Sequence, residues 1–170
     1  MTWIDWVIAA FALFAALQGL KRGLLAAVIG IVAVFASYLI ASAWYRSLGD
    51  AIERTVRFTP AWGDTVAFGG LFLLVYDLVA ILTVMAFGGE RLPLPSRVSG
   101  AVLGFVRGTM LAAALLIIAA AAPFGDPIRR DLERSTVAPV ALAVYRGGLR
   151  AVAALLPSTA KPFGLEPGTF

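Results

Sequence analysis

Two charged residues, Asp77 and Arg107, lie inside long apolar stretches, where an unpaired charge is costly. Each lies about ten residues from the break at residues 88–95, on opposite sides of it, so antiparallel helices would hold both roughly 15 Å from that break. We predict that the two side chains form a polar pair, directly or through water. Such a pair could lock two helices together or help to move ions or protons, and Arg107 could instead meet another partner, backbone carbonyls or water.

Residues that commonly carry catalysis are scarce. The chain has no histidine and no cysteine, which excludes imidazole acid–base chemistry, cysteine nucleophiles and cysteine-based metal sites. Asp50 and Glu53 come nearest to a carboxylate pair, and their position on a polar segment favours two solvated side chains. We therefore expect no catalytic, cofactor-binding or metal site, no cofactor, and a protein that is not an enzyme.

Four long apolar runs occupy residues 3–20, 24–44, 65–88 and 98–122. Residues 24–44 include no charged side chain and, as a helix, would span roughly 30 Å, the thickness of the hydrocarbon core of a bilayer. Hydrophobic residues make up 61% of the chain and charged residues 14%, and the mean hydropathy is +0.90. These properties predict an integral membrane protein with four spans, in which Asp77 and Arg107 are an intramembrane pair.

The first run has aromatic residues at its start and a basic turn at its end. Trp3 and Trp6 are typical of the membrane–water interface, and the absence of a basic stretch before the run argues against a cleaved signal peptide. Residues 19–23 begin and end with glycine and include Lys21 and Arg22, so they predict a tight basic turn.

The later breaks are polar or rich in proline and glycine. Within residues 46–64 apolar residues recur every fourth position, which predicts a short helix on the membrane surface that ends at Pro60. A solvated loop helix without function is the alternative. Residues 88–95 contain two glycines and two prolines, and Ser96 is expected to cap the helix that follows.

Three glycines, Gly100, Gly104 and Gly108, recur every fourth residue around Arg107. In a helix this spacing places them on one face, where the missing side chains let another backbone approach closely. We predict that they form a helix-packing surface and that residues 98–122 form the central helix of a tight bundle.

The segment after residue 125 has a different composition. Residues 126–134 are strongly charged, whereas residues 140–156 are apolar except for Arg146 and Arg150 on one helical face. A fifth span would bury both arginines at a cost of about 5–7 kcal/mol on insertion scales. We therefore favour an amphipathic helix lying in the membrane interface over a fifth span.

The predicted fold is all-α: an integral membrane four-helix bundle with an interfacial amphipathic C-terminal helix. The predicted division is a four-span transmembrane domain at residues 1–125 and an amphipathic helical tail at residues 126–170. The net charge of +4 fits arginines at an anionic membrane surface better than a nucleic-acid partner. The expected partner is the lipid bilayer, with other membrane proteins or further copies of the chain as candidates.

Three motifs resemble the colicin V production (CvpA) proteins of bacterial inner membranes. They are Trp3-Ile4-Asp5-x-x-Ile8, Gly19-x-x-Arg22-Gly23, and the segment at residues 96–108, Ser-Arg-Val-x-Gly-Ala-x-x-Gly-x-x-Arg-Gly. The resemblance covers residues 3–122 and preserves the order and spacing of the motifs. The chain departs from the family pattern at Ser96, where the family usually has aspartate before the arginine that matches Arg97.

The resemblance implies a non-enzymatic inner-membrane protein linked to production or export of a peptide toxin and to envelope homeostasis. We expect a scaffold or assembly role, and the alternative is a small transporter or channel subunit that uses the Asp77–Arg107 site. Basic residues are nearly balanced between the two sides of the membrane, so the positive-inside rule does not decide the topology. Relatives fused to periplasmic serine proteases imply that both termini lie in the periplasm.

Overall fold

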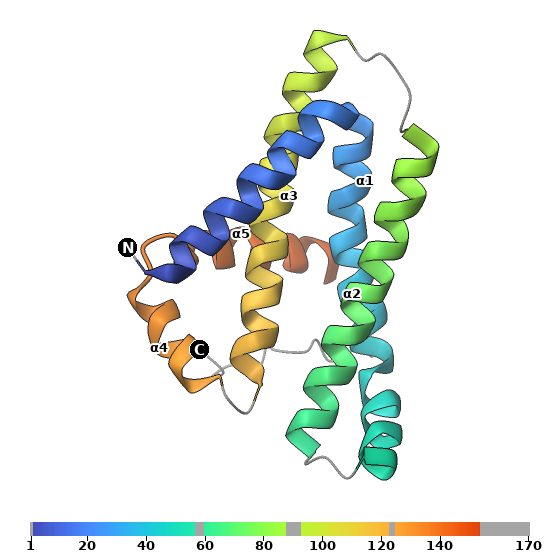
Figure 1. Ribbon diagram of the computed structural model, residues 1–170, viewed down its shortest axis with the longest axis vertical. Helices are drawn as coiled ribbons and strands as arrows, with labels where there is room; N and C mark the ends of the chain where they lie inside the picture. Colours follow the sequence, from blue (N-terminus) through green and yellow to red (C-terminus); the bar gives the residue numbers. More distant parts are fainter. Residues whose placement is uncertain (1, 57–59, 88–92, 123–124, 154–170) are drawn as a thin grey trace.

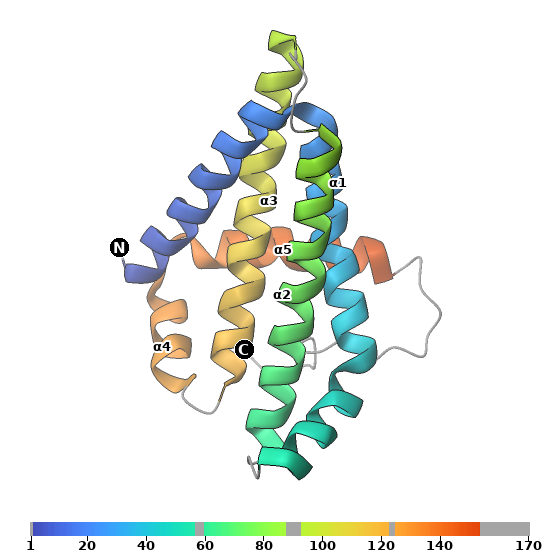
Figure 2. The ribbon, with the colours of Figure 1, turned by 45° about the vertical axis from the view of Figure 1, so that its right-hand side comes forward.

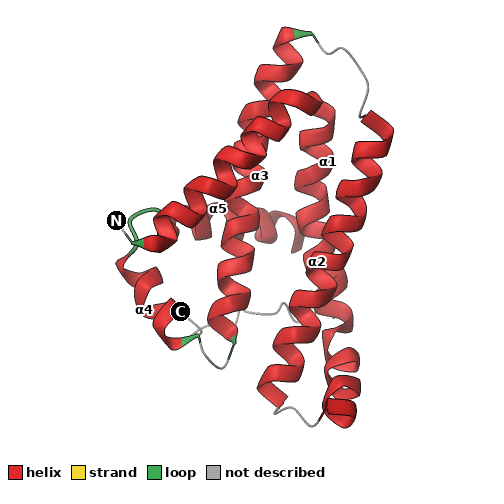
Figure 3. Cartoon of the chain, viewed as in Figure 1, coloured by secondary structure: helices red, strands yellow, loops and turns green. Residues whose placement is uncertain are grey.

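The computed structural model describes residues 2–56, 60–87, 93–122 and 125–153. These residues form five helices without a strand (Figure 3): α1 Trp3–Val56, α2 Pro60–Phe87, α3 Leu94–Ala121, α4 Asp126–Arg134 and α5 Ala138–Ala153. The all-α prediction is therefore confirmed for the described part of the chain. Three of these helices, α1, α2 and α3, are long and apolar enough to cross a membrane.

Helix α1 is kinked at Gly23, whose φ of 79° and ψ of −174° are not helical. A positive φ strains any residue with a Cβ, so glycine is the residue that permits this bend. We call residues 3–22 the first arm and residues 24–56 the second arm. Figure 1 shows the first arm rising to the kink and the second arm running back down from it. The predicted basic turn is thus a sharp kink. Four membrane spans stay a prediction, which requires each arm of α1 to cross the membrane by itself.

The polar connection after the second run differs from its prediction. Residues 46–56 continue α1 as its last turns instead of forming a separate short helix. Pro60 begins α2 instead of ending a helix, in keeping with the preference of proline for the first helical positions, where its missing N–H is no loss. The same effect moves the start of α3 ahead of Ser96, because α3 begins at Leu94 and has Pro95 in its first turn.

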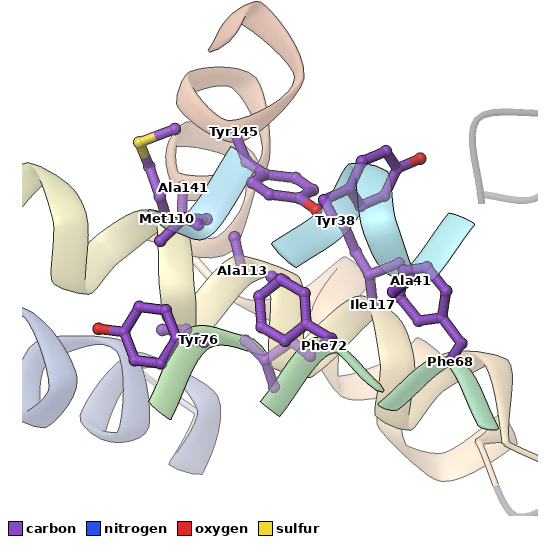
Figure 4. Close-up of a cluster of buried hydrophobic side chains, with 14 of the residues drawn as sticks. Tyr38, Ala41, Phe68, Phe72, Tyr76, Met110, Ala113, Ile117, Ala141 and Tyr145 are labelled. Atoms are coloured by element: carbon purple, nitrogen blue, oxygen red, sulfur yellow. The ribbon is translucent and has the colours of Figure 1, made fainter. Parts of the chain in front are cut away.

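Helices α1 and α3 form the most extensive pairing in the fold, and α2 packs on α1 while touching α3 only lightly. Aromatic rings fill the buried cluster between the second arm and α2 (Figure 4). Phe72 stacks between Phe68 and Tyr76, with ring centroids 6.4 Å from each, and Tyr38 meets Phe68 edge-on at 5.8 Å. Such ring pairs add stability beyond their buried area.

Helices α4 and α5 pack against the bundle and share its core. Leu132 of α4 and Ala138, Ala141 and Tyr145 of α5 belong to the same buried cluster as the rings above. Figures 1 and 2 show α5 lying across the long helices, and its Tyr145 ring meets Tyr38 edge-on at 6.1 Å. An interfacial position for α5 is not confirmed, and the boundary at residue 125 stays a prediction. The Arg150 side chain lies outside the described residues.

Candidate functional site

A cavity of about 420 Å³ lies between the first arm of α1, α2 and α3. Its polar lining consists of Gln18, Arg22, Tyr76, Asp77 and Arg107, and its apolar lining includes Phe11, Phe14, Ile81, Val84 and Leu111. Each helix contributes residues three or four positions apart, which is the spacing of one helical face. The two charges singled out from the sequence therefore line one and the same cavity.

The Arg107 side chain is held by contacts from both arms of α1 and from α2. Its Nη2 donates a hydrogen bond to Gln18 Oε1 at 3.1 Å, and its guanidinium carbon lies 6.0 Å from the centre of the Tyr76 ring. At Gly30 of the second arm a Cβ would lie 2.3 Å from Nη1 of Arg107. The glycine at position 30 thus provides the room in which the guanidinium lies.

Asp77 lines the same cavity but makes no ion pair with Arg107 among the described residues. Its side chain is exposed on the surface of the bundle, whereas Arg107 is half-buried. The described residues thus show no direct ion pair between the two side chains, and Arg107 contacts Gln18 and Tyr76. Pairing through water stays a prediction.

The three glycines of α3 lie against the backbone of the first arm. A Cβ at Gly100 would lie 2.4 Å from the Gly19 carbonyl oxygen, at Gly104 2.4 Å from that of Ala15, and at Gly108 2.4 Å from that of Phe11. These separations are far below ordinary van der Waals contact, so only glycine permits this approach. All three glycines are buried.

The start of α3 is joined to both sides of the α1 kink. Arg97 Nε donates to the Leu20 carbonyl at 3.3 Å, and the Leu24 N–H donates to Ser96 Oγ at 3.2 Å. Polar groups left open where a helix is interrupted need such partners. Ser96 therefore acts as an acceptor for α1 instead of capping α3, a role for which aspartate also has the necessary oxygen.

The two basic residues of the turn have different surroundings. Arg22 is half-buried and lines the cavity, whereas Lys21 is exposed. Of these two residues, only Arg22 is therefore placed to contact a ligand in the cavity.

The N-terminal residue Trp3 binds α4, and Asp5 binds the segment that connects α4 and α5. Trp3 Nε1 donates to Asp131 Oδ2 at 2.7 Å. The buried Asp5 carboxylate accepts hydrogen bonds from the Ser135 hydroxyl, from the Val137 N–H at 3.1 Å and from the Thr2 N–H at 2.8 Å. The first turn of α1 thereby holds the C-terminal helices to the bundle.

Sequence reasoning did not single out Gln18 or Tyr76 as site residues, nor Ser135 as a partner of Asp5. A signal for Gln18 exists, because it is the only glutamine in a chain without asparagine and it lies inside an apolar run. An amide in such a run requires a partner. No comparable signal marks Ser135, whose partner is distant in the sequence.

One protein family, described as Colicin V production protein, has a model that matches residues 4–156. This finding confirms the resemblance drawn from the three motifs. The match continues beyond residue 122 through α4 and α5, in agreement with the contacts of Trp3 and Asp5 to that region. Searches of curated proteins and of solved structures returned no match.

Proposed function

Because the chain belongs to the colicin V production family, we propose that it is a multi-pass protein of the bacterial inner membrane that supports production or export of a peptide toxin or maintenance of the cell envelope. The observation that carries this proposal is the family match over residues 4–156. We further propose that it acts without catalysing a reaction, as a scaffold or assembly factor.

The outer surface of the bundle supports the membrane location. Large apolar side chains are exposed on the first arm, on α2 and on α3, including Trp6, Leu13, Leu74, Met85 and Val102, each at least half exposed. Apolar surface of this extent is unfavourable in water and favourable against lipid tails. Three helices also have the length and composition of membrane spans.

The packing of α3 supports a scaffold role. Its glycine face leaves no room for adjustment against the first arm, and its Ser96 and Arg97 hold the kink. A rigid bundle with an apolar exterior is suited to present fixed surfaces to other membrane proteins.

The proposed topology places both termini in the periplasm. In Figure 1 the kink and the start of α3 lie at one end of the molecule, whereas the end of α3 and α4 lie toward the other. A phosphatase reporter fused after residue 125 should be active, and one inserted within residues 89–95 should be silent. The reverse pattern would invert the topology.

The functional proposal is tested in a host that secretes a peptide toxin and lacks its own family member. Expression of this chain should restore toxin in the medium, or restore resistance of the envelope to bile salts or detergent. A Gly104→Ala variant, which disturbs the α1–α3 interface, should restore less than a Gly70→Ala variant, whose added Cβ meets nothing within 4 Å. If the wild-type chain restores neither toxin secretion nor envelope resistance, the proposal is contradicted.

The cavity favours a second candidate, a small transporter or channel subunit. Charged and polar side chains inside an apolar bundle commonly mark a path for ions or solutes. Purified protein in liposomes separates the two candidates. A reproducible flux that is lost in Arg107→Ala and kept in Arg130→Ala, a change on α4 away from the cavity, would replace the scaffold role.

A further inference from the structure

The cavity carries more positive charge than its own residues neutralise. Arg22 and Arg107 line it together with a single carboxylate, Asp77. Arg107 has five N–H donors and makes one hydrogen bond within the described residues, to Gln18. Its Nε is buried and meets no acceptor there. A half-buried cation with open donors is stabilised by a bound anion, and a guanidinium fits phosphate oxygens with two parallel hydrogen bonds.

The mouth of the cavity opens on the apolar flank of the bundle. Phe14 of the first arm and Ile81 of α2 line the cavity and are also 64% and 57% exposed. Val84 lines it as well and is 40% exposed. A side chain that lines the cavity and is also exposed on the outer surface lies at the rim of the cavity. Because this flank has the character of a lipid-facing surface, a molecule that enters between these rims comes from the bilayer.

We propose that this cavity binds the phosphate-bearing headgroup of an anionic membrane lipid. Arg107, assisted by Arg22, contacts the phosphate, and the lipid chains pass through the apolar rim into the bilayer. A volume of about 420 Å³ lies within the range of small-molecule sites and holds a headgroup with the first carbons of its chains. This proposal goes beyond the proposed function and does not depend on it.

Asp77 is expected to weaken the binding of the anionic lipid. Its carboxylate lines the same cavity and repels a phosphate, so it offsets part of the positive charge that attracts the lipid. Asp77→Asn should therefore bind the anionic lipid more tightly, whereas Arg107→Gln should bind it more weakly. A purely structural role for the two residues would weaken binding in both variants.

The test is native mass spectrometry of the full chain in mild detergent, titrated with phosphatidylglycerol, phosphatidylcholine or inorganic phosphate. Wild-type protein should retain phosphatidylglycerol in preference to phosphatidylcholine. Arg107→Gln should lose about tenfold in affinity, the effect of removing one charge-assisted contact. Arg130→Gln, which removes an equal charge from an exposed position on α4, should leave the affinity unchanged.

Ala80→Phe provides an independent variant, because it fills the cavity while all charges stay in place. It should abolish the preference for phosphatidylglycerol while the melting temperature stays near that of the wild type. Equal retention of both lipids, or unchanged affinity in Arg107→Gln and Ala80→Phe, would overturn the proposal. Displacement of the lipid by inorganic phosphate at equal concentration would also overturn it, because the site would then take a free anion.

Discussion

Gly104→Ala should destabilise the protein through a single methyl group at the α1–α3 interface. The added Cβ would lie 2.4 Å from the Ala15 carbonyl oxygen, 3.0 Å from the Ala15 carbonyl carbon and 3.2 Å from the Ala16 Cα. These neighbours are backbone atoms of a helix, which cannot rotate away as a flexible side chain would. The first arm of α1 must therefore move back as a unit.

The magnitude follows from that displacement. Overpacking a close interface costs about 1–3 kcal/mol. Alanine is also favoured over glycine within a helix by about 1 kcal/mol, which offsets part of the loss. Gly70→Ala in α2 receives the same helical gain, and its Cβ meets nothing within 4 Å. The difference between the two variants therefore isolates the packing cost, about 1–3 kcal/mol.

The assay is unfolding of both variants and the wild type in one detergent, followed by circular dichroism over a denaturant or temperature series. We expect the order of stability Gly70→Ala, wild type, Gly104→Ala. Equal stability of the two alanine variants would refute the close approach of α3 to the first arm. A Gly104→Ser variant should fall below Gly104→Ala, because its hydroxyl adds further bulk at the same backbone atoms.

Three other changes test the remaining contacts. Asp5→Ala removes the acceptor of three hydrogen bonds and should cost about 2–4 kcal/mol; the Val137 amide should exchange hydrogen faster, and an unchanged rate would contradict the contact. Gly30→Ala should displace the Arg107 guanidinium, because its Cβ would lie 2.3 Å from Nη1. This variant should weaken phosphatidylglycerol binding and leave the hydrogen exchange rate of the Val137 amide unchanged. Asp77→Asn alone or Arg107→Leu alone should destabilise the protein more than the double substitution does, because either single change leaves the other charge without its partner. Strictly additive losses in thermal unfolding would show that the two residues act independently.

The long apolar helices, the interruptions at Gly23 and at residues 88–95, and one packing face could be predicted from the sequence. Long apolar runs without charges predict membrane helices, since the backbone must satisfy its own hydrogen bonds where water is absent. Glycine at 23 and the proline-rich residues 88–95 mark interruptions, since one adopts a positive φ and proline lacks an N–H. The spacing of Gly100, Gly104 and Gly108 predicts a close contact because helical periodicity alone puts them on one face.

Local patterns near prolines were less informative. The sequence patterns predict that Pro60 ends one helix and that Pro95 belongs to a break, whereas both prolines lie in the first turn of a helix. Proline is compatible with either position, since a missing N–H is tolerated both after a helix and at its start. The two cases differ in whether the helix lies before or after the proline.

The partners of the charged residues required the tertiary structure. Sequence spacing places Asp77 and Arg107 at similar depth, but the rotation of each helix about its axis depends on packing. In the fold Arg107 points to Gln18 and Tyr76.

The contacts of Asp5 with Ser135 and Val137 likewise join segments more than a hundred residues apart. Periodicity reports which residues share a helix face, because that depends on the local backbone alone. It does not report which face of another helix they meet, since that is set by the close packing of the whole bundle.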